Sequence, residues 1–393
     1  MQQQNSLSYY SNMYRKILSL LTLILVSIVC REQWTFTTAS IYTDTSRGII
    51  YQYEGSTASV YGYTESVASS VTIPATIKID NRTYSVKSIY PFAFNGCTRL
   101  NTISVAASLD SVGMHAFELC TSLTKVTLTF CKRIGEFAFN GDGQLKTLIL
   151  PQTTLKEIDD YAFSLCTSLS AVTLPNTLTT LGHGAFYSCG LTSITLPNSL
   201  TEIPDYTFFD CLSLKEIVLP NSLERIGKWA LANCRITIVK WPDSLSSIGD
   251  HALRNTASSP IVLPQGVSEA GGMVFSQLGN VPVIYVYSNS LLSTTTFAGT
   301  DFSNTTLYVL PSLLEDYRTS HSALFKEILP LGDINGDKTY DVSDVINLLV
   351  YIRKSGTYAL EQCAPNYRDV NGDGIINSHD AKAMAKDVLN ISK

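Results

Sequence analysis

Apolar residues recur in a fixed order along residues 85–279, where two short apolar segments are followed by an Ala-Phe pair. The pattern in its clearest form is Leu-x-x-Ile-x-Leu-Pro-Asn-x-Leu-x-x-Ile-Gly-x-x-Ala-Phe-x-x-Cys. Successive copies are 22 to 24 residues apart when aligned on the Ala position, which holds Ala93, Ala116, Ala138, Ala162, Ala185, Thr207, Ala230, Ala252 and, in a weaker ninth copy, Val274. A steady period of this length predicts a solenoid of stacked repeats instead of one globular core.

Each repeat is expected to contribute one short strand and one returning segment. The first apolar segment, such as residues 145–150, predicts a strand, and the Pro that follows it in six copies ends the strand because Pro cannot donate to a ladder. A second apolar pair, such as Leu178 and Leu181, predicts a return along the opposite wall. Gly182 and its equivalents are expected to permit the next bend, and Ala and Phe to fill the interior.

The segments on either side of the repeats have different patterns. Residues 40–84 carry β-branched and aromatic residues between Gly, Ser and Pro, which predicts an N-terminal β cap over the open edge of the solenoid. The period fades in residues 280–330, which are predicted to form the C-terminal cap. The predicted fold class is therefore a mainly β solenoid with short strands, turns and 3-10 or helical segments, followed by a small all-α domain at residues 331–393.

The repeats resemble the BspA-like class of leucine-rich repeats through their Leu-Pro-Asn and Ala-Phe-x-x-Cys segments. The resemblance covers about residues 84–278, and residues 307–328 are similar to the strand and helix that close many such solenoids. This resemblance implies a bacterial protein that is secreted or displayed on the cell surface.

Two twelve-residue stretches after the solenoid follow one calcium-loop pattern. Side-chain oxygens at loop positions 1, 3, 5 and 12, a backbone carbonyl at 7, and a ligand or water at 9 surround one cation in such loops. The sequence therefore predicts two calcium ions as cofactors. The predicted ligands are Asp333, Asn335, Asp337, Thr339 through its carbonyl, Asp341 and Asp344 in the first loop, and Asp369, Asn371, Asp373, Ile375 through its carbonyl, Asn377 and Asp380 in the second.

Each loop leads into a segment with apolar residues at helical spacing: Val345, Leu348, Leu349 and Ile352 after the first, and Ala381, Met384, Ala385, Val388 and Leu389 after the second. This unit of an EF-hand-like loop and an exiting helix recurs after 36 residues and resembles a type I dockerin over about residues 332–389. Asp at loop position 12 agrees with dockerins, whereas Lys338 stands at position 6, where Gly is usual.

The dockerin resemblance implies a cohesin domain as partner. It places the partner-binding residues at loop positions 10 and 11, which are Val342, Ser343, Ser378 and His379. Two alternatives remain open from the sequence: calcium folds a C-terminal tail that has no partner, and these four residues are ordinary helix surface.

The first 39 residues are predicted to be a signal peptide region. Arg15 and Lys16 precede an apolar run at residues 17–29, which is too short to span a bilayer but has the length of a signal-peptide core. A buried core helix is the alternative, Met13 is an alternative start, and no lipid anchor is expected at Cys30 because Val29 is larger than lipidation sites prefer. We therefore expect a secreted or cell-surface protein without a transmembrane span after signal removal.

Nine cysteines in an exported chain would usually suggest disulfides. Stacked residues, however, point their side chains in parallel and not at one another, so we expect reduced, buried thiols. Six cysteines share the slot three residues after the repeat Phe, namely Cys97, Cys120, Cys166, Cys189, Cys211 and Cys234, and Cys131 replaces an apolar residue of a return segment.

Composition and motifs argue against several function classes. The net charge is -5 and only 16% of residues are charged, so no basic field exists for nucleic acid. No phosphate loop, nucleophile elbow or pair of acids at hydrolase spacing appears, so we predict no catalytic residues and no enzyme. His115 and His251 are expected to be space-filling rings, because Phe92, Phe137, Tyr161, Tyr206 and Trp229 occupy the same slot in other repeats.

The outward face of the repeat strands remains as a candidate surface for an extracellular protein or glycan, although a merely solubilising surface is an open alternative. Its residues are mostly hydroxyl-bearing or Lys: Thr124, Lys125, Thr127, Lys146, Thr147, Ser170, Thr173, Thr192, Ser193, Thr195, Lys215, Thr237 and Lys240. We predict a non-enzymatic adhesion protein tethered by its calcium-dependent tail. The alternatives are an accessory component of a cohesin–dockerin complex for polysaccharide catabolism and, more distantly, a hydrolase.

Overall fold

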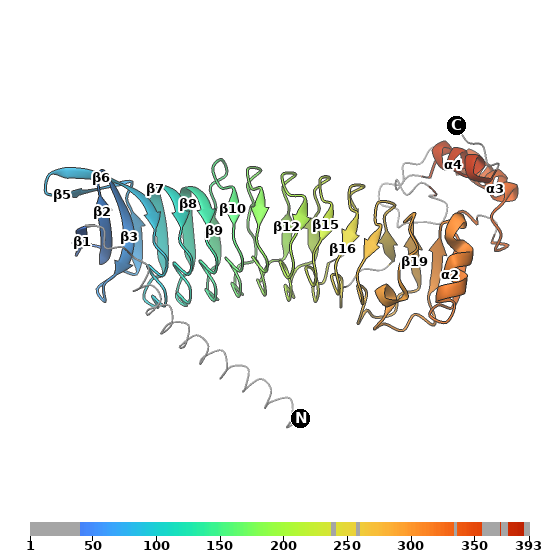
Figure 1. Cartoon of the computed structure of the whole chain (residues 1–393), viewed down its shortest axis with the longest axis horizontal. Helices are drawn as coiled ribbons and strands as arrows, with labels where there is room; N and C mark the ends of the chain where they lie inside the picture. Colours follow the sequence, from blue (N-terminus) through green and yellow to red (C-terminus); the bar gives the residue numbers. More distant parts are fainter. Residues whose placement is uncertain are drawn as a thin grey trace, which may run out of the picture.

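The computed structural model describes residues 40–236, 241–256, 260–333, 336–355, 370 and 376–388. These residues form a long solenoid with an antiparallel cap at the N-terminal end and three α-helices at the C-terminal end (Figure 1). The mainly β solenoid predicted from the repeat period is confirmed. The predicted signal region lies outside the described residues.

The N-terminal cap is antiparallel at its outer edge and parallel where it meets the repeats. Strands β1 (Ser40–Asp44), β2 (Ile49–Glu54) and β3 (Thr57–Tyr63) form an antiparallel meander, and β5 (Thr76–Ile79) forms a hairpin with β6 (Arg82–Ile89). Asp80 and Asn81 between β5 and β6 have φ of 48° and 65°, as a two-residue hairpin turn requires. β3 pairs in parallel with β6, and β4 (Ser70–Ile73) pairs in parallel with β7 (Thr102–Val112). These parallel pairs connect the cap to the sheet of the repeats.

Two columns of parallel strands run along the solenoid. The first continues from β4 and β7 through β8 (Lys125–Ile134), β9 (Thr147–Ile149), β12 (Ser193–Thr195), β14 (Glu216–Val218), β17 (Ile261–Leu263), β19 (Val283–Val286), β20 (Thr306–Val309) and β21 (Glu327–Pro330). The second column contains the return segments β10 (Glu157–Ile158), β11 (Thr180–Leu181), β13 (Glu202–Ile203), β15 (Arg225–Ile226), β16 (Ser247–Ile248) and β18 (Glu269–Ala270). Equivalent residues pair across turns, for example Ile203 with Ile226.

Strands β7 and β8 each run through both columns without a break. Their repeats carry Ala106 and Thr129 where later repeats have Pro, and the pairing of β7 with β8 resumes at Ser108 and Phe130 after a register shift. Proline therefore decides where the two walls of each turn separate.

A file of Phe rings fills the interior. Phe94, Phe117, Phe139, Phe163, Phe186 and Phe208 are fully buried and lie nearly parallel, with ring centroids 5.0–5.8 Å apart. The backbone holds this spacing, because the N–H of each of these Phe residues donates to the carbonyl at the Ala position of the next turn, as in Phe94 to Ala116 at 2.7 Å. Packing and hydrogen bonding therefore enforce the same repeat distance.

A second file of rings lies near the surface, in the slot just before the repeat Ala. His115 stacks between Phe92 and Phe137 at 4.8 and 5.0 Å, and His251 stacks on Trp229 at 4.1 Å, as space-filling rings should. All residues in this slot have φ between 53° and 61°, including Gly184 where the file is interrupted. The left-handed backbone at this slot was not predicted from the sequence, since most of its occupants are aromatic.

The repeat glycines have a different role from the predicted one. Gly182, Gly227 and Gly249 do not adopt positive φ, so they do not supply an unusual bend. A Cβ atom at Gly182 would instead lie 2.3 Å from the backbone of Asp159 in the preceding turn, and Gly227 and Gly249 are similarly close to their neighbours. These glycines allow adjacent turns to approach each other.

The cysteine slot forms a third internal file, and seven cysteines in the described residues are free and buried, as predicted. Each thiol from Cys120 to Cys234 in this slot donates to the carbonyl of the Phe one turn earlier, for example Cys189 Sγ to Phe163 O at 3.0 Å. Burial raises the pKa of the Cys120 thiol well above its ordinary value, so this thiol is a poor nucleophile. Cys30 and Cys363 lie outside the described residues.

Asp142 occupies the same slot as the cysteines in its own turn. Its side chain is fully buried, and neither carboxyl oxygen has a hydrogen-bond partner among the described residues. Burial first, and then the negative charge of Glu118, raise the pKa of Asp142 well above its ordinary value. The protonated form is therefore the stable one in the folded chain.

The C-terminal end combines a last sheet with short helices. Parallel strands β17, β19, β20 and β21 form this sheet, and η1 (Thr294–Phe297), η2 (Pro311–Leu313) and α2 (Leu314–His321) lie in its connections. Tyr317 of α2 is buried, and its hydroxyl accepts a hydrogen bond from the Leu292 N–H at 3.0 Å. Beyond β21, α3 (Val342–Ser355) and α4 (Ser378–Val388) share a separate small core around Leu348 and Met384.

Replacing Phe163 by Ala should lower the free energy of unfolding by about 3–5 kcal/mol, because the change leaves a cavity in the middle of the Phe file. Urea unfolding followed by circular dichroism measures the change. As a control, Leu212→Ala at an exposed position should alter stability by no more than about 0.5 kcal/mol. Equal effects of the two substitutions would contradict the packed file.

Replacing Asp142 by Cys should stabilise the protein by about 1–3 kcal/mol near pH 7, because it removes a buried carboxyl without partners. The raised pKa means that the wild type loses stability as pH rises above about 4, since the unfolded chain releases this proton more easily. The gain from the substitution should therefore shrink toward pH 4 in urea unfolding measured across pH. Asp110→Asn, at an exposed acid, is the control, and a gain independent of pH would contradict a protonated Asp142.

Candidate functional site

The first calcium-loop sequence begins immediately after the last solenoid strand. Asp333 is buried, and its two carboxylate oxygens accept hydrogen bonds from the N–H groups of Gly336 and Lys338 at 2.8 and 2.9 Å. Asp344 at position 12 is fully buried on α3, and its Oδ2 accepts from the Asp341 N–H at 2.9 Å. The loop backbone is therefore wound around the carboxylates of positions 1 and 12.

Lys338 at loop position 6 adopts φ of 69°, the left-handed conformation for which Gly is usual there. Lys338 thus adopts the backbone conformation that Gly usually supplies at this position, at some conformational cost. Its ammonium group lies 2.9 Å from Glu327 Oε2 on β21.

Negative charge is concentrated in the first loop. Burial raises the pKa of Asp333, and repulsion from Asp344 and Asp337 adds to the increase against the hydrogen bonds that Asp333 accepts. A buried carboxylate beside two others is the arrangement that a divalent cation stabilises. The first loop therefore supplies the oxygen ligand types that calcium prefers. Asn335 lies outside the described residues.

The second loop repeats the geometry of the first where the structure describes it. Asp380 at position 12 is fully buried and accepts hydrogen bonds from the N–H groups of Asn377 at 2.8 Å and Val370 at 3.0 Å. The predicted ligands Asp369, Asn371, Asp373 and Ile375 lie outside the described residues. Among the described residues, which include four aspartates of the first loop but omit most of the second, no three His, Cys, Asp or Glu side chains converge closely enough to hold a metal.

The four predicted partner-binding residues, Val342, Ser343, Ser378 and His379, are all exposed at the first turns of α3 and α4. On α3, Val342 continues into Ile346 and Leu349, so that three exposed apolar side chains follow one stripe, and Ile346 is 55% exposed. Helical spacing had grouped Leu349 with the core residues Val345 and Leu348, but the structure places it on the outside. The sequence analysis did not identify Ile346.

The helix α4 presents a different outer surface. Its exposed residues include His379, Lys382 and Lys386, whereas its apolar residues Ala381 and Met384 are buried. The two loop–helix units are therefore related in backbone geometry but not in surface chemistry.

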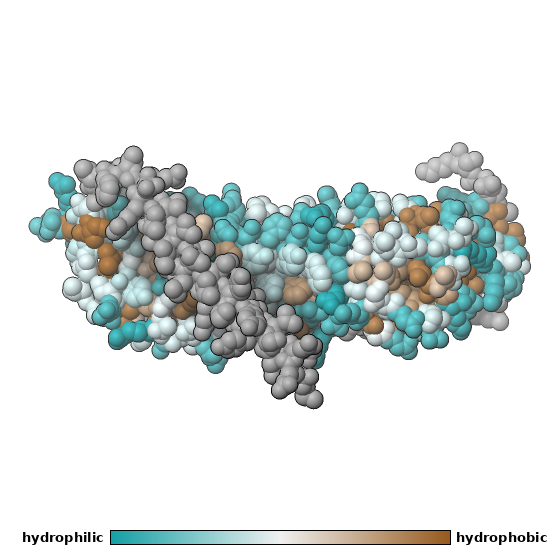
Figure 2. Space-filling view, turned by 60° about the horizontal axis from the view of Figure 1, so that its bottom comes forward, coloured by the Kyte–Doolittle hydropathy of each residue, from teal (hydrophilic) through white to brown (hydrophobic). Residues whose placement is uncertain are grey.

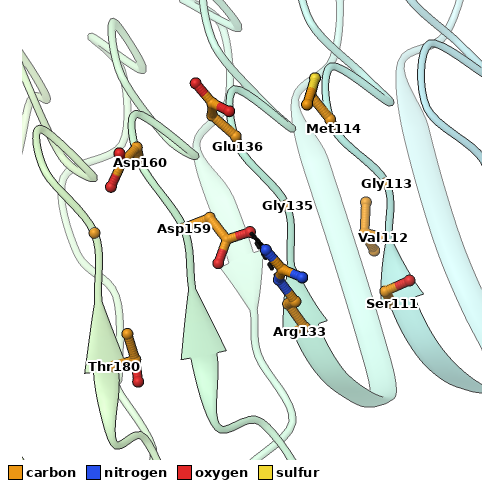
Figure 3. A pocket seen from close by; sticks show the side chains of 11 residues that line it. Ser111, Val112, Gly113, Met114, Arg133, Gly135, Glu136, Asp159, Asp160 and Thr180 are labelled. Carbon is orange, nitrogen blue, oxygen red and sulfur yellow. Dashed lines mark hydrogen bonds and ion pairs between the residues drawn. The ribbon is translucent and has the colours of Figure 1, made fainter.

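The side of the solenoid carries shallow hollows instead of a deep cleft. One of about 450 Å³ crosses four successive turns and is shown in Figure 3, where Glu136 and Asp160 lie above the pair formed by Arg133 and Asp159. Arg133 Nη2 is 2.6 Å from Asp159 Oδ2, and Asp160 Oδ1 accepts the His183 N–H of the next turn at 2.7 Å. Two of the three acids thus have structural partners, and the hollow contains no evident acid and base pair.

Glu118 forms a polar cluster near the first ring slot. Its carboxylate accepts hydrogen bonds from Asn95 and Asn140 at 3.0 and 2.9 Å and lies 2.7 Å from His115 Nδ1. Burial would raise the pKa of Glu118, but these hydrogen bonds and the charge of His115 outweigh burial and lower it. The cluster links three successive turns, which is a structural role.

The predicted outward face of the strands is exposed or half-exposed at every position that the structure describes, while Thr237 and Lys240 lie outside the described residues. Ile149 and Val218 add two exposed apolar side chains to it. On the side seen in Figure 2, polar residues dominate the middle turns and hydrophobic residues gather in small groups, mostly toward the two ends.

Comparisons with known proteins agree with both parts of the chain. The family model described as BspA type leucine rich repeat region (6 copies) matches residues 63–190 and 179–306, and the model of the dockerin type I domain matches residues 331–389. Type I dockerins typically bind calcium and a cohesin partner. No curated protein matches the chain.

Several solved structures are similar to the solenoid. A leucine-rich repeat protein from Bacteroides ovatus is 24% identical, with a TM-score of 0.51, over 77% of this chain and 80% of its own. A leucine rich cell surface protein from Faecalibacterium prausnitzii is 22% identical, with a TM-score of 0.43, over 75% and 96%. The Treponema protein described as T. pallidum Leucine Rich Repeat protein is 27% identical, with a TM-score of 0.44, over 49% and 89%.

The leucine-rich repeat fold and the dockerin fold are both non-catalytic types of fold. None of the helices in the described part of the chain is long and apolar enough to cross a membrane. The repeat match extends over more than half of the chain, and the observed solenoid has the two-walled turns and the Phe and Cys files that the repeat sequence requires. The chain belongs to the BspA-type leucine-rich repeat family and carries a C-terminal type I dockerin domain.

Proposed function

We propose that this protein is a secreted or cell-surface binding protein without enzymatic activity, whose solenoid engages an extracellular protein or glycan while its calcium-dependent tail attaches it to a cohesin. The observation that carries this proposal is the combination of a long repeat surface, whose described part carries open hollows, with a dockerin domain on one chain. Two separate binding surfaces on one chain allow avidity, in which attachment through the tail raises the local concentration of the solenoid.

Calcium would be held in the first loop by Asp333, Asn335, Asp337, Thr339 through its carbonyl, Asp341 and Asp344, and in the second by Asp369, Asn371, Asp373, Ile375 through its carbonyl, Asn377 and Asp380. Each ion supplies the positive charge that the clustered carboxylates lack. The raised pKa of Asp333 is consistent with this assignment, because burial first, and then the charges of Asp344 and Asp337, disfavour its carboxylate form, and a bound cation would favour that form.

The partner surface of the tail is proposed to centre on α3. Val342, Ile346 and Leu349 form an exposed apolar stripe next to Ser343, whereas Ser378 and His379 lead into the charged surface of α4. Fully desolvated side chains near the centre of an interface supply most of the binding energy, and charges exposed at its rim supply little. We therefore expect α3 to make the principal contact with a cohesin and α4 to contribute less.

The ligand of the solenoid is proposed to lie along the outward strand face. This surface offers hydroxyl groups and scattered Lys residues in regular rows, which suits hydrogen bonding to an extended partner. A small-molecule ligand is disfavoured because the hollows on the solenoid are open and shallow.

A second candidate function is an accessory role in a cohesin–dockerin complex that degrades polysaccharide. The dockerin match favours it, because such a domain attaches its chain to a cohesin-bearing partner. The solenoid would then be a binding component among enzymes. A hydrolase is the least favoured function, since Asp159 and Asp160 in the hollow are held by Arg133 and the next turn.

Calorimetric titration of the full chain with calcium should give two sites. Asp344→Asn and Asp380→Asn should each remove one site or weaken it by more than tenfold, because each removes the position-12 carboxylate around which its loop is wound. Asp316→Asn on α2 is the control and should leave the stoichiometry at two. Absence of calcium uptake, or unchanged stoichiometry in both loop variants, would rule out the assigned ligands.

Binding to immobilised cohesin domains should depend on α3 more than on α4. Ile346→Asp should weaken binding about tenfold or more by placing a charge in an apolar contact, whereas the matched change Lys382→Asp on α4 should change it less than about twofold. Both variants should still bind two calcium ions, which shows that the domain is folded. An equal loss in the two variants would contradict an α3-centred surface, and no binding of the wild type to any cohesin tested would favour a calcium-folded tail without this partner.

A further inference from the structure

In the first column of parallel strands, one position of each strand points away from the solenoid core. The residues at this position become mostly aromatic or large and apolar toward the C-terminal end. In the middle turns this position holds residues such as Thr127, Thr195 and Val218, and Val218 is 56% exposed. In β17, β19, β20 and β21 the position holds Val262, Tyr285, Tyr308 and Leu329. Tyr285 is only 7% exposed although it points away from the solenoid core, so the outer face of these last turns is covered.

The segment that leads into the dockerin domain packs against this outer face. Leu331 is fully buried in one apolar cluster with Tyr285 and Tyr287, and Val262, Val283, Tyr308 and Leu310 pack against that cluster. The Leu331 N–H also donates to Val309 O at 2.7 Å, so the backbone is still paired to the solenoid at this point. The solenoid and the calcium domain are thus joined by a packed segment and not by a free linker.

The joint continues directly into the first calcium loop. Gly332 has φ of 90°, and a Cβ there would lie 2.7 Å from the Tyr340 ring and 3.3 Å from Met384, both in the domain core. The next residue is Asp333, the first calcium ligand, and Lys338 of the same loop bridges back to Glu327 on β21. Lys338 therefore contacts both the loop, where its N–H donates to Asp333, and the last strand, where its ammonium group pairs with Glu327.

We propose that the outer face of β19–β21 is a docking surface for the dockerin domain of the same chain, and that calcium in the first loop and docking on this surface stabilise each other. The polar contact between the domain and the solenoid is Lys338 with Glu327, and the apolar contact is Leu331 with Tyr285 and Tyr287. The domain is then held in one orientation by the solenoid, with calcium occupancy acting on the stability of the last turns.

Coupling of this kind is reciprocal. It can therefore be measured as the effect of calcium on the last strands or as the effect of the docking surface on calcium affinity. If calcium stabilises the docked arrangement, then loss of the docking surface must weaken calcium binding by the same factor. Coupling factors between linked sites are typically about 5–150-fold. This inference rests on the calcium binding proposed above but is independent of whether a cohesin is the partner.

The test compares Tyr285→Ser with Val218→Ser in the full chain, since the two positions are equivalent in the strand wall but only the first is covered. Calcium affinity is measured by calorimetry, and amide hydrogen exchange in β20 and β21 is followed by mass spectrometry with and without calcium. In the wild type calcium should slow exchange in these strands at least about tenfold. Tyr285→Ser should weaken calcium binding at the first loop about tenfold and remove that protection, while Val218→Ser should change neither.

Lys338→Ala provides a second variant that leaves the apolar face intact and should weaken calcium binding by a smaller factor, about two- to fivefold. Exchange in β7 and β8 reports whether the rest of each variant is folded. The proposal is overturned if Tyr285→Ser binds calcium like the wild type, or if calcium protects α3 and α4 but not β20 and β21. A wild type that takes up no calcium at all would remove the proposed calcium function as well, which distinguishes the two failures.

Discussion

Contact between neighbouring turns is the interaction on which this structure depends. A single turn has two strands of two or three residues and one buried Phe, which is too little to form a core. Stability comes from repetition, because the rings from Phe94 to Phe208 are 5.0–5.8 Å apart and the N–H of each of these Phe residues donates to a carbonyl of the next turn. The small residues follow from the same constraint, since Gly182 and its equivalents let adjacent backbones come together.

This constraint also shapes the function. Rows of equal turns produce flat or gently hollowed walls, and their polar groups are used to join turns, as Glu118 joins Asn95 and Asn140. Such walls suit extended partners better than small substrates. The dockerin domain differs because its buried carboxylates, Asp333, Asp344 and Asp380, accept hydrogen bonds from loop backbones, so we expect its order to depend on cations.

The sequence predicted what is periodic and missed what depends on placement in space. The turns, the Phe file, the buried thiols and the stacked His115 could all be predicted, because each slot recurs in several copies. The left-handed backbone of the ring slot could not, since aromatic residues give no sign of positive φ. Asp142 could have been found by aligning it with the cysteine slot, whereas the exposure of Leu349 and the pairing of Lys338 with Glu327 required knowledge of which elements are neighbours.

The most direct test of the account is a crystal structure of the full chain grown with calcium, with anomalous scattering used to locate the ions. We predict two calcium ions, one within reach of Asp333 and Asp344 and one beside Asp380, with Leu331 still packed against Tyr285 and with the rings from Phe94 to Phe208 stacked in one file. Ions bound elsewhere, empty loops, or a calcium domain detached from the last strands would contradict it.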